Sequence, residues 1–258
     1  MNHFIYFPIT HYHLIISHVM TQSFDDCIST LILDPQVFPV NFIKKVKGEN
    51  ININLWNNVY LIPRYTRLGR LCAIASNKIF KRSFEQLLCP RNNKLVIFTF
   101  GSYLSNIFLN NAKSSTKGST EIILGEDGIF PYYGFEICSN YLFYLPHRNF
   151  YEKAKMSFWC LLNRNVTFDH RKIDRIVVLK KKLVSYDLLN QYEVDEVKLE
   201  QENCFAAFEI LNRYYCYKEF CDFQNIDIVF FDNDLSYIGA MTEEQEYKVL
   251  SKIFAELR

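Results

Sequence analysis

The residues most able to do chemistry are two adjacent carboxylates, Glu126 and Asp127, followed by Gly128. They come after an apolar run at 120–124 that is typical of a buried strand. Side chains alternate along a strand, so at most one of the two carboxylates faces a cleft directly, and Gly128 permits a tight turn beside it. A carboxylate at a cleft edge can accept a proton from an attacking hydroxyl group. On spacing alone, a solvated acidic turn that ends the strand is the plainer interpretation.

Three other segments follow apolar runs and could contribute to a site. Residues 10–13, Thr-His-Tyr-His, can begin a helix whose N-terminus holds an anionic group, although a capping Thr10 with partly exposed histidines explains them more simply. Gly101 and Ser102 can form a turn and a helix cap. Asp232-Asn233-Asp234 matches a D-x-D pattern that could hold a divalent metal on a nucleotide diphosphate, but an acidic loop is the simpler interpretation.

The elements that must position these residues alternate between strands and helices. A strand, helix and strand over 94–124 predict a βαβ unit with parallel neighbours, so we expect an α/β, Rossmann-type, mainly parallel sheet with helices on both faces. Ligands bind outside the carboxyl ends of such strands. The expected strands are 4–7, 30–33, 58–62, 94–99, 120–124, 173–179 and 226–231. The expected helices begin at Thr10, cover 66–88, about 103–110, about 150–163 and about 202–218, and close the chain after Thr242.

Composition excludes several classes of protein. A chain of 258 residues can bury a sizeable core, and its net charge of +1 gives no field that favours nucleic acid. Its eight cysteines show no C-x-x-C and no zinc-finger spacing, which is typical of reduced thiols in a cytoplasmic protein. The N-terminus lacks the pattern of a signal peptide, and no apolar run reaches the roughly 18 residues of a spanning helix. Any contact with a membrane is therefore expected to be peripheral.

Four segments, in order along the chain, resemble one known family. They are the opening run from Phe4 to Leu14, the acidic motif Glu126-Asp127-Gly128 with Tyr132-Tyr133 after it, the strand 172–178, and Leu235 to Gly239 followed by Thr242-Glu243-Glu244. Together they resemble the bacterial sialyltransferases of glycosyltransferase family 52, a plan shared with related polysialyltransferases and lipooligosaccharide transferases.

The resemblance implies a GT-B arrangement of two Rossmann-like domains. Residues 1–220 would form the acceptor-side domain, and 221–258 the start of an incomplete nucleotide-binding domain. The implied reaction moves sialic acid from CMP-sialic acid to a galactose-type hydroxyl of a surface glycan, lipooligosaccharide or capsule, with inversion and without a metal or other cofactor. Asp127 would be the general base. The residues expected to bind substrate are Thr10, His11, Tyr12, Gly101, Ser102, Glu126, Gly128, Tyr132 and Tyr133.

The sequence also departs from the family. Those enzymes carry a His-Pro motif whose histidine meets the donor phosphate, and no histidine here is followed by proline. The sequence ends at Arg258, where the second half would be getting under way. Three interpretations follow: a truncated or split reading frame, an inactive remnant that still binds a glycan acceptor, or a short variant that completes its cleft as a homodimer or with a separate C-terminal half.

Two other functions compete with the transferase. A non-catalytic glycan-binding or interaction protein would bind acceptor but not CMP, and a metal-dependent transferase using Asp232 and Asp234 would lose activity in EDTA. The partners expected for the transferase are a nucleotide-sugar donor and a glycan acceptor, with no nucleic acid. Its expected location is the cytoplasm, including the inner face of the inner membrane.

Overall fold

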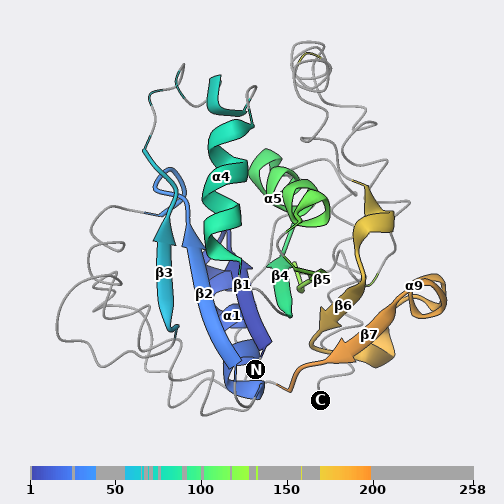
Figure 1. Ribbon diagram of the computed structural model, residues 1–258. Helices are drawn as coiled ribbons and strands as arrows, with labels where there is room; N and C mark the ends of the chain where they lie inside the picture. Colours follow the sequence, from blue (N-terminus) through green and yellow to red (C-terminus); the bar gives the residue numbers. More distant parts are fainter. Residues whose placement is uncertain are drawn as a thin grey trace, which may run out of the picture.

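A single parallel sheet organises the protein (Figure 1). The computed structural model describes residues 2–24, 27–38, 56–64, 66, 69, 72–74, 77–88, 92–99, 102–116, 118–127, 132, 158 and 169–198. Its seven strands lie in the order β3-β2-β1-β4-β5-β6-β7, and every neighbouring pair is parallel. The strands are β1 Asn2–Phe7, β2 Cys27–Leu33, β3 Asn58–Leu61, β4 Asn93–Ile97, β5 Thr120–Leu124, β6 Arg175–Val178 and β7 Glu193–Glu196. The predicted α/β, Rossmann-type parallel sheet is confirmed.

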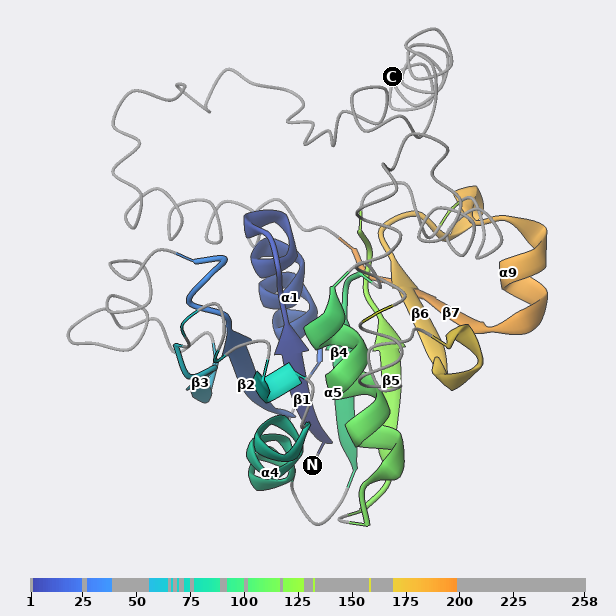
Figure 2. The same cartoon turned by 90° about the horizontal axis from the view of Figure 1, so that it is seen from above.

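Helices cover both faces of this sheet, as predicted. Helix α1 (His11–Ser23) lies on one face, and α4 (Lys78–Leu87) and α5 (Tyr103–Ser114) lie on the other (Figure 2). Strand side chains alternate between the two cores: in β4, Val96 packs on the α1 side, whereas Leu95 and Ile97 pack on the side of α4 and α5. The chain leaves β1 toward β2 and returns on the other side as β4, so the order reverses between β1 and β4. In such sheets the carboxyl edge at this reversal is where ligands bind.

The central strand β1 is fixed on both sides by buried polar contacts. The His3 side chain lies within 2.8 Å of Thr30 Oγ1 in β2 and within 3.2 Å of Asn93 Oδ1 in β4. All three side chains are buried, so each hydrogen bond replaces one that water would otherwise make. Burial lowers the pKa of His3, which favours the neutral ring in this setting.

The predicted caps of two helices are confirmed, but one predicted end is wrong. Thr10 has an extended backbone, and its Oγ1 accepts the His13 N–H at 3.2 Å at the start of α1. Ser102 caps α5 in the same way. We expected α5 to end near residue 110. The helix instead continues to Ser114, because Asn111 is buried on its packed face.

The expected helix over 66–88 is interrupted. Asn77 has a left-handed φ of 54°, a conformation that asparagine tolerates better than most residues, and α4 begins only at Lys78. The Asn77 side-chain amide exchanges two hydrogen bonds with Asn111 of α5, at 2.9 and 3.1 Å. This paired amide joins the start of α4 to the end of α5 and compensates for the break.

Residues 180–198, which the sequence pattern left unassigned, form three short elements. They are the 3-10 helix η3 (Lys181–Leu183), helix α9 (Tyr186–Gln191) and edge strand β7; another 3-10 helix, η2 (His170–Lys172), precedes β6. Strand β7 reads Glu-Val-Asp-Glu, and Val194 is its buried residue. A charged edge strand of this kind shows no apolar run, which is why the sequence did not predict it.

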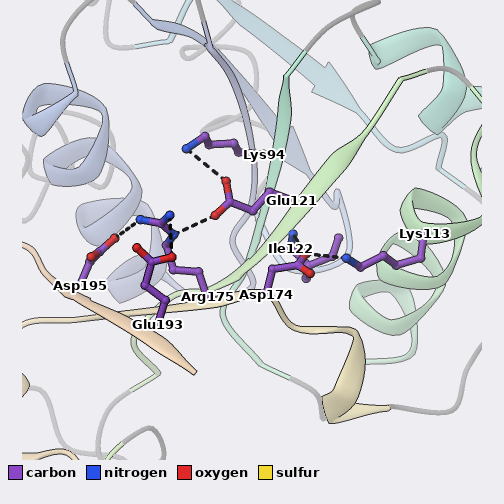
Figure 3. Close-up of polar contacts among 8 residues, drawn as sticks. All are labelled: Lys94, Lys113, Glu121, Ile122, Asp174, Arg175, Glu193 and Asp195. Carbon is purple, nitrogen blue, oxygen red and sulfur yellow. Dashed lines mark hydrogen bonds and ion pairs between the residues drawn. The ribbon is translucent and has the colours of Figure 1, made fainter. Parts of the chain in front are cut away.

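Ion pairs connect the last four strands of the sheet (Figure 3). Arg175, the first residue of β6, lies 2.8 Å from Glu121 of β5, and 3.0 and 2.5 Å from Glu193 and Asp195 of β7. Lys94 of β4 completes the row at 3.1 Å from Glu121. Lys94, Glu121, Arg175 and Glu193 each lie at the first or second position of their strands. The row therefore lies toward the amino edge of the sheet, away from the edge where ligands bind.

Several expectations fall outside the described residues. These are the helices near 150–163 and 202–218, the strand 226–231, the closing helix after Thr242, and the proposed domain 221–258. Among the described helices, none has the length and apolar character needed to cross a lipid bilayer.

We predict that Arg175→Met lowers the free energy of unfolding by about 1–3 kcal/mol, because it leaves three neighbouring carboxylates without their shared cation. Urea unfolding measures this loss, and hydrogen exchange should show β7 opening first. The matched control is Lys113→Met, which removes a single pair with Asp174 (Figure 3) and should cost less than about 1 kcal/mol. Equal losses in the two variants would contradict a special role for Arg175.

Candidate active site at the carboxyl edge

The chemically capable side chains gather at the carboxyl ends of β1, β5 and β6. The turn after β1 and the start of α1 bring Tyr12 and His13 to this edge, and the end of β5 brings Glu126 and Asp127. Leu179, directly after β6, adds a backbone N–H. Residues far apart in sequence therefore meet where the topology of a parallel sheet places ligands.

A hydrogen bond between His13 and Asp127 is the most informative contact. The Nε2 of His13 lies 2.8 Å from Asp127 Oδ1, and the backbone N–H of Ile9 donates to His13 Nδ1 at 3.3 Å. Because Nδ1 accepts a hydrogen bond from an N–H group, it carries the lone pair of the neutral ring, and Nε2 carries the hydrogen. The imidazole therefore donates to the carboxylate. Both ring nitrogens are occupied.

In this pair the histidine is the buried side chain and the carboxylate is the more exposed one, which is the reverse of the arrangement in Ser-His-Asp hydrolases. There the carboxylate is buried and orients a histidine that meets the substrate. Here the His13 side chain is 1% exposed and the Asp127 side chain is 17% exposed. Among the described residues, His13 is the hydrogen-bond partner of Asp127, and Oδ2 accepts no second bond. The group that can meet a substrate is thus the carboxylate, held in one orientation by the histidine.

Packing behind His13 fixes the ring from the other side. The His13 ring stacks on Phe98 with centroids 4.7 Å apart and planes 11° from parallel. Phe98 in turn lies against Gly125, where an added Cβ would come within 2.6 Å of the Phe98 ring. The Gly125 N–H donates to Ile97 at 2.8 Å and continues the ladder between β4 and β5. Glycine is therefore required at 125 by the close approach of an aromatic ring.

Glu126 is more deeply buried than Asp127 and is 6% exposed. Its Oε1 accepts the Tyr12 hydroxyl at 2.8 Å, and its Oε2 accepts the Tyr132 hydroxyl at 2.5 Å and the Leu179 N–H at 2.6 Å. We call these four residues the Glu126 cluster. Of the two adjacent carboxylates, Glu126 is thus buried in the cluster and Asp127 is partly exposed.

Burial governs the protonation of this cluster. Burial raises the pKa of the Glu126 carboxyl above its ordinary value, although the three donors act in the opposite direction. Burial, followed by the neighbouring Glu126, also raises the pKa of the Tyr12 and Tyr132 hydroxyls. Both hydroxyls therefore keep their protons at physiological pH and remain donors to the carboxyl group.

The residues predicted to bind substrate have several different placements. Thr10 caps α1, His11 begins it, and Ser102 caps α5. Tyr12, Glu126 and Tyr132 belong to the Glu126 cluster, and their contact with substrate stays a prediction. Gly101, Gly128 and Tyr133 lie outside the described residues, as do Asp232 and Asp234. Within the described part of the chain, no three His, Cys, Asp or Glu side chains are grouped so as to hold a metal ion.

Sequence reasoning did not assign a role to His13, Phe98 or Gly125. His13 was visible in the Thr-His-Tyr-His segment after β1, and its position three residues into a capped helix was the available signal. Its partner Asp127 lies 114 residues away. The stacking of Phe98 on His13 depends on packing, which spacing along the chain does not reveal.

We predict that Gly125→Ala lowers the free energy of unfolding by about 1–3 kcal/mol, because the new methyl group must displace the buried Phe98 ring. Thermal or urea unfolding measures the loss. Adding Phe98→Leu should recover part of it, since the smaller side chain leaves room for the methyl group. Simple additivity of the two substitutions would contradict the contact as the cause.

We predict that Glu126→Ala destabilises the protein by about 2–4 kcal/mol, because it leaves two tyrosine hydroxyls and a backbone N–H without their acceptor. Glu126→Gln should cost much less, since its amide can accept on one side and donate on the other. Urea unfolding of both variants tests this, and similar losses would contradict it.

The raised pKa of Glu126 predicts that the stability of the protein depends on pH. The pKa of Glu126 is raised in the folded protein above its ordinary 4.5, so in the window above 4.5 the folded state binds more protons than the unfolded state. Stability contributed by this group is therefore present below 4.5 and is lost as pH rises through the folded pKa. The stability of the unsubstituted protein relative to Glu126→Gln should fall over that window, and a rise would contradict the direction of the shift.

No family model and no curated protein matches the chain.

Proposed function

We propose that this protein is a sialyltransferase-like glycosyltransferase that moves sialic acid from CMP-sialic acid to a galactose-type hydroxyl of a surface glycan. The observation that carries the proposal is the orientation of Asp127 by His13. A partly exposed carboxylate is held by a buried, neutral imidazole at the carboxyl edge of a Rossmann-type sheet, beside the reversal of strand order. The resemblance of the Glu-Asp-Gly segment to the acidic motif of family 52 sialyltransferases supports the donor and the acceptor class.

In this mechanism Asp127 acts as general base. Its Oδ2 takes the proton of the acceptor hydroxyl while that oxygen forms a bond to the anomeric carbon of sialic acid. The bond from the anomeric carbon to the phosphate oxygen breaks, and CMP leaves with the electron pair, so the configuration inverts. His13 is a positioning residue: its hydrogen bond to Oδ1 restricts the carboxylate to one orientation. The proposal also requires the nucleotide-binding half of a GT-B enzyme, which has no counterpart among the described residues.

We predict that the full chain releases CMP from CMP-sialic acid when a galactosyl acceptor is present, and that Asp127→Asn lowers kcat by at least about a hundredfold, the order typical of a lost general base. Asp174→Asn is the matched control, since it makes the same neutralising change toward the amino edge of the sheet, outside the candidate site, and it should retain most of the activity.

Positioning by His13 has its own test. His13→Phe keeps an aromatic ring against Phe98 but removes the donor to Asp127, so kcat should fall while KM for the acceptor stays near its original value. His13→Gln, which retains a donor, should recover part of kcat. A full chain that neither releases CMP nor binds it in calorimetry would overturn the proposal and favour a glycan-binding protein.

A further inference from the structure

We propose that the segment Lys180–Leu189, which follows β6 and Leu179, is a docking surface for an anionic lipid bilayer. The inference goes beyond the proposed function and does not depend on it, because lipid binding is measured without any transfer reaction. We call this segment the basic-apolar loop. It consists of Lys180, η3, the turn at Val184 and Ser185, and most of α9.

The charge of the loop favours an anionic partner. Lys180, Lys181 and Lys182 are consecutive and exposed, and Asp187 is the only acidic residue in 180–189. Within the described part of the chain, none of the three ammonium groups is in an ion pair. Glu196 of β7 contacts the loop through the Lys181 N–H, and Glu193 and Asp195 of the same strand are paired with Arg175. Exposed lysines near an anionic bilayer each add to binding through its negative surface potential.

Exposed apolar side chains lie in the same short segment. Tyr186 is 76% exposed, and Leu183 and Leu189 are each 38% exposed. Tyr186 and Leu189 are three residues apart on α9, so they share one side of the helix. Lysines beside tyrosine and leucine match the composition of surfaces that lie in the headgroup region of a bilayer, where the aromatic and aliphatic groups enter and the ammonium groups meet phosphate. A soluble anion would use the lysines but would leave the apolar groups without a role.

The loop is held in place by residues that point inward. Val184 and Leu188 are buried, and the Lys181 N–H donates to Glu196 at 2.8 Å. These anchors alternate with the exposed residues, so the exposed groups are presented from a fixed frame. Fewer rotatable groups then need to be ordered when the surface binds.

The loop also adjoins the candidate active site. The Lys180 N–H donates to the Tyr132 hydroxyl at 3.3 Å, and the Ser185 N–H donates to the Tyr132 carbonyl at 3.2 Å. Tyr132 in turn donates to Glu126, the neighbour of Asp127. In Figure 1 the loop and α9 lie at the end of the sheet formed by β6 and β7. Docking through this loop would place the carboxyl edge of the sheet close to the lipid headgroups.

Co-sedimentation of the full chain with vesicles tests the proposal. We expect binding to phosphatidylcholine vesicles that contain phosphatidylglycerol, weaker binding to phosphatidylcholine alone, and loss of binding as salt is raised. Replacing Lys180, Lys181 and Lys182 together by Gln should weaken binding on the order of a hundredfold, about fivefold for each lysine. Adding Tyr186→Ser and Leu189→Ser should weaken vesicle binding further, both at low salt and at raised salt.

The matched control is the triple substitution Lys78→Gln, Lys81→Gln and Arg82→Gln, which removes the same charge from exposed positions on α4. It should leave vesicle binding nearly unchanged. Equal weakening by the two triple variants would overturn the proposal, because it would show an effect of total charge. No binding to anionic vesicles, or equal binding to both kinds of vesicle, would also overturn it. Circular dichroism verifies that each variant is folded.

Discussion

The buried carboxylate of Glu126 is the constraint on which the candidate site depends. A carboxyl group removed from water is costly unless its oxygens are hydrogen-bonded, and here three donors come from three separate parts of the chain. Satisfying it joins the start of α1, the residue Tyr132 and the end of β6. Asp127 is the next residue, so its backbone is placed by the same cluster. The exposed carboxylate can be oriented because the buried one is fixed.

The two edges of the sheet have different tasks. Toward the amino edge, ion pairs centred on Arg175 join β5, β6 and β7, where water screens part of their attraction. At the carboxyl edge the polar groups are more deeply buried and joined by hydrogen bonds to neutral partners. The first arrangement holds edge strands in register, and the second holds one carboxylate toward solvent.

The sequence predicted those parts of the structure that local patterns control. Apolar runs identified β1 to β6 and their parallel arrangement, and Thr10 identified the start of α1. It failed where distant residues decide the outcome. The break at Asn77 is compensated by Asn111, β7 is held by Arg175, and the orientation of Asp127 comes from His13, which Phe98 supports from behind. None of these partners lies close to the other in sequence, so spacing alone could not reveal them.

The central place of β1 has a consequence for how the chain folds as it is made. Strand β1 is made before either of its neighbours and needs a partner on both sides, yet Asn93, which bonds His3 from β4, is 90 residues further along. Until then the strand can pair only with β2, and the N–H and C=O groups on its other edge stay unpaired. Folding must therefore wait for a distant segment, which is the slow step expected of parallel sheets. During that interval the open edge of β1 is available for mispairing with other strands.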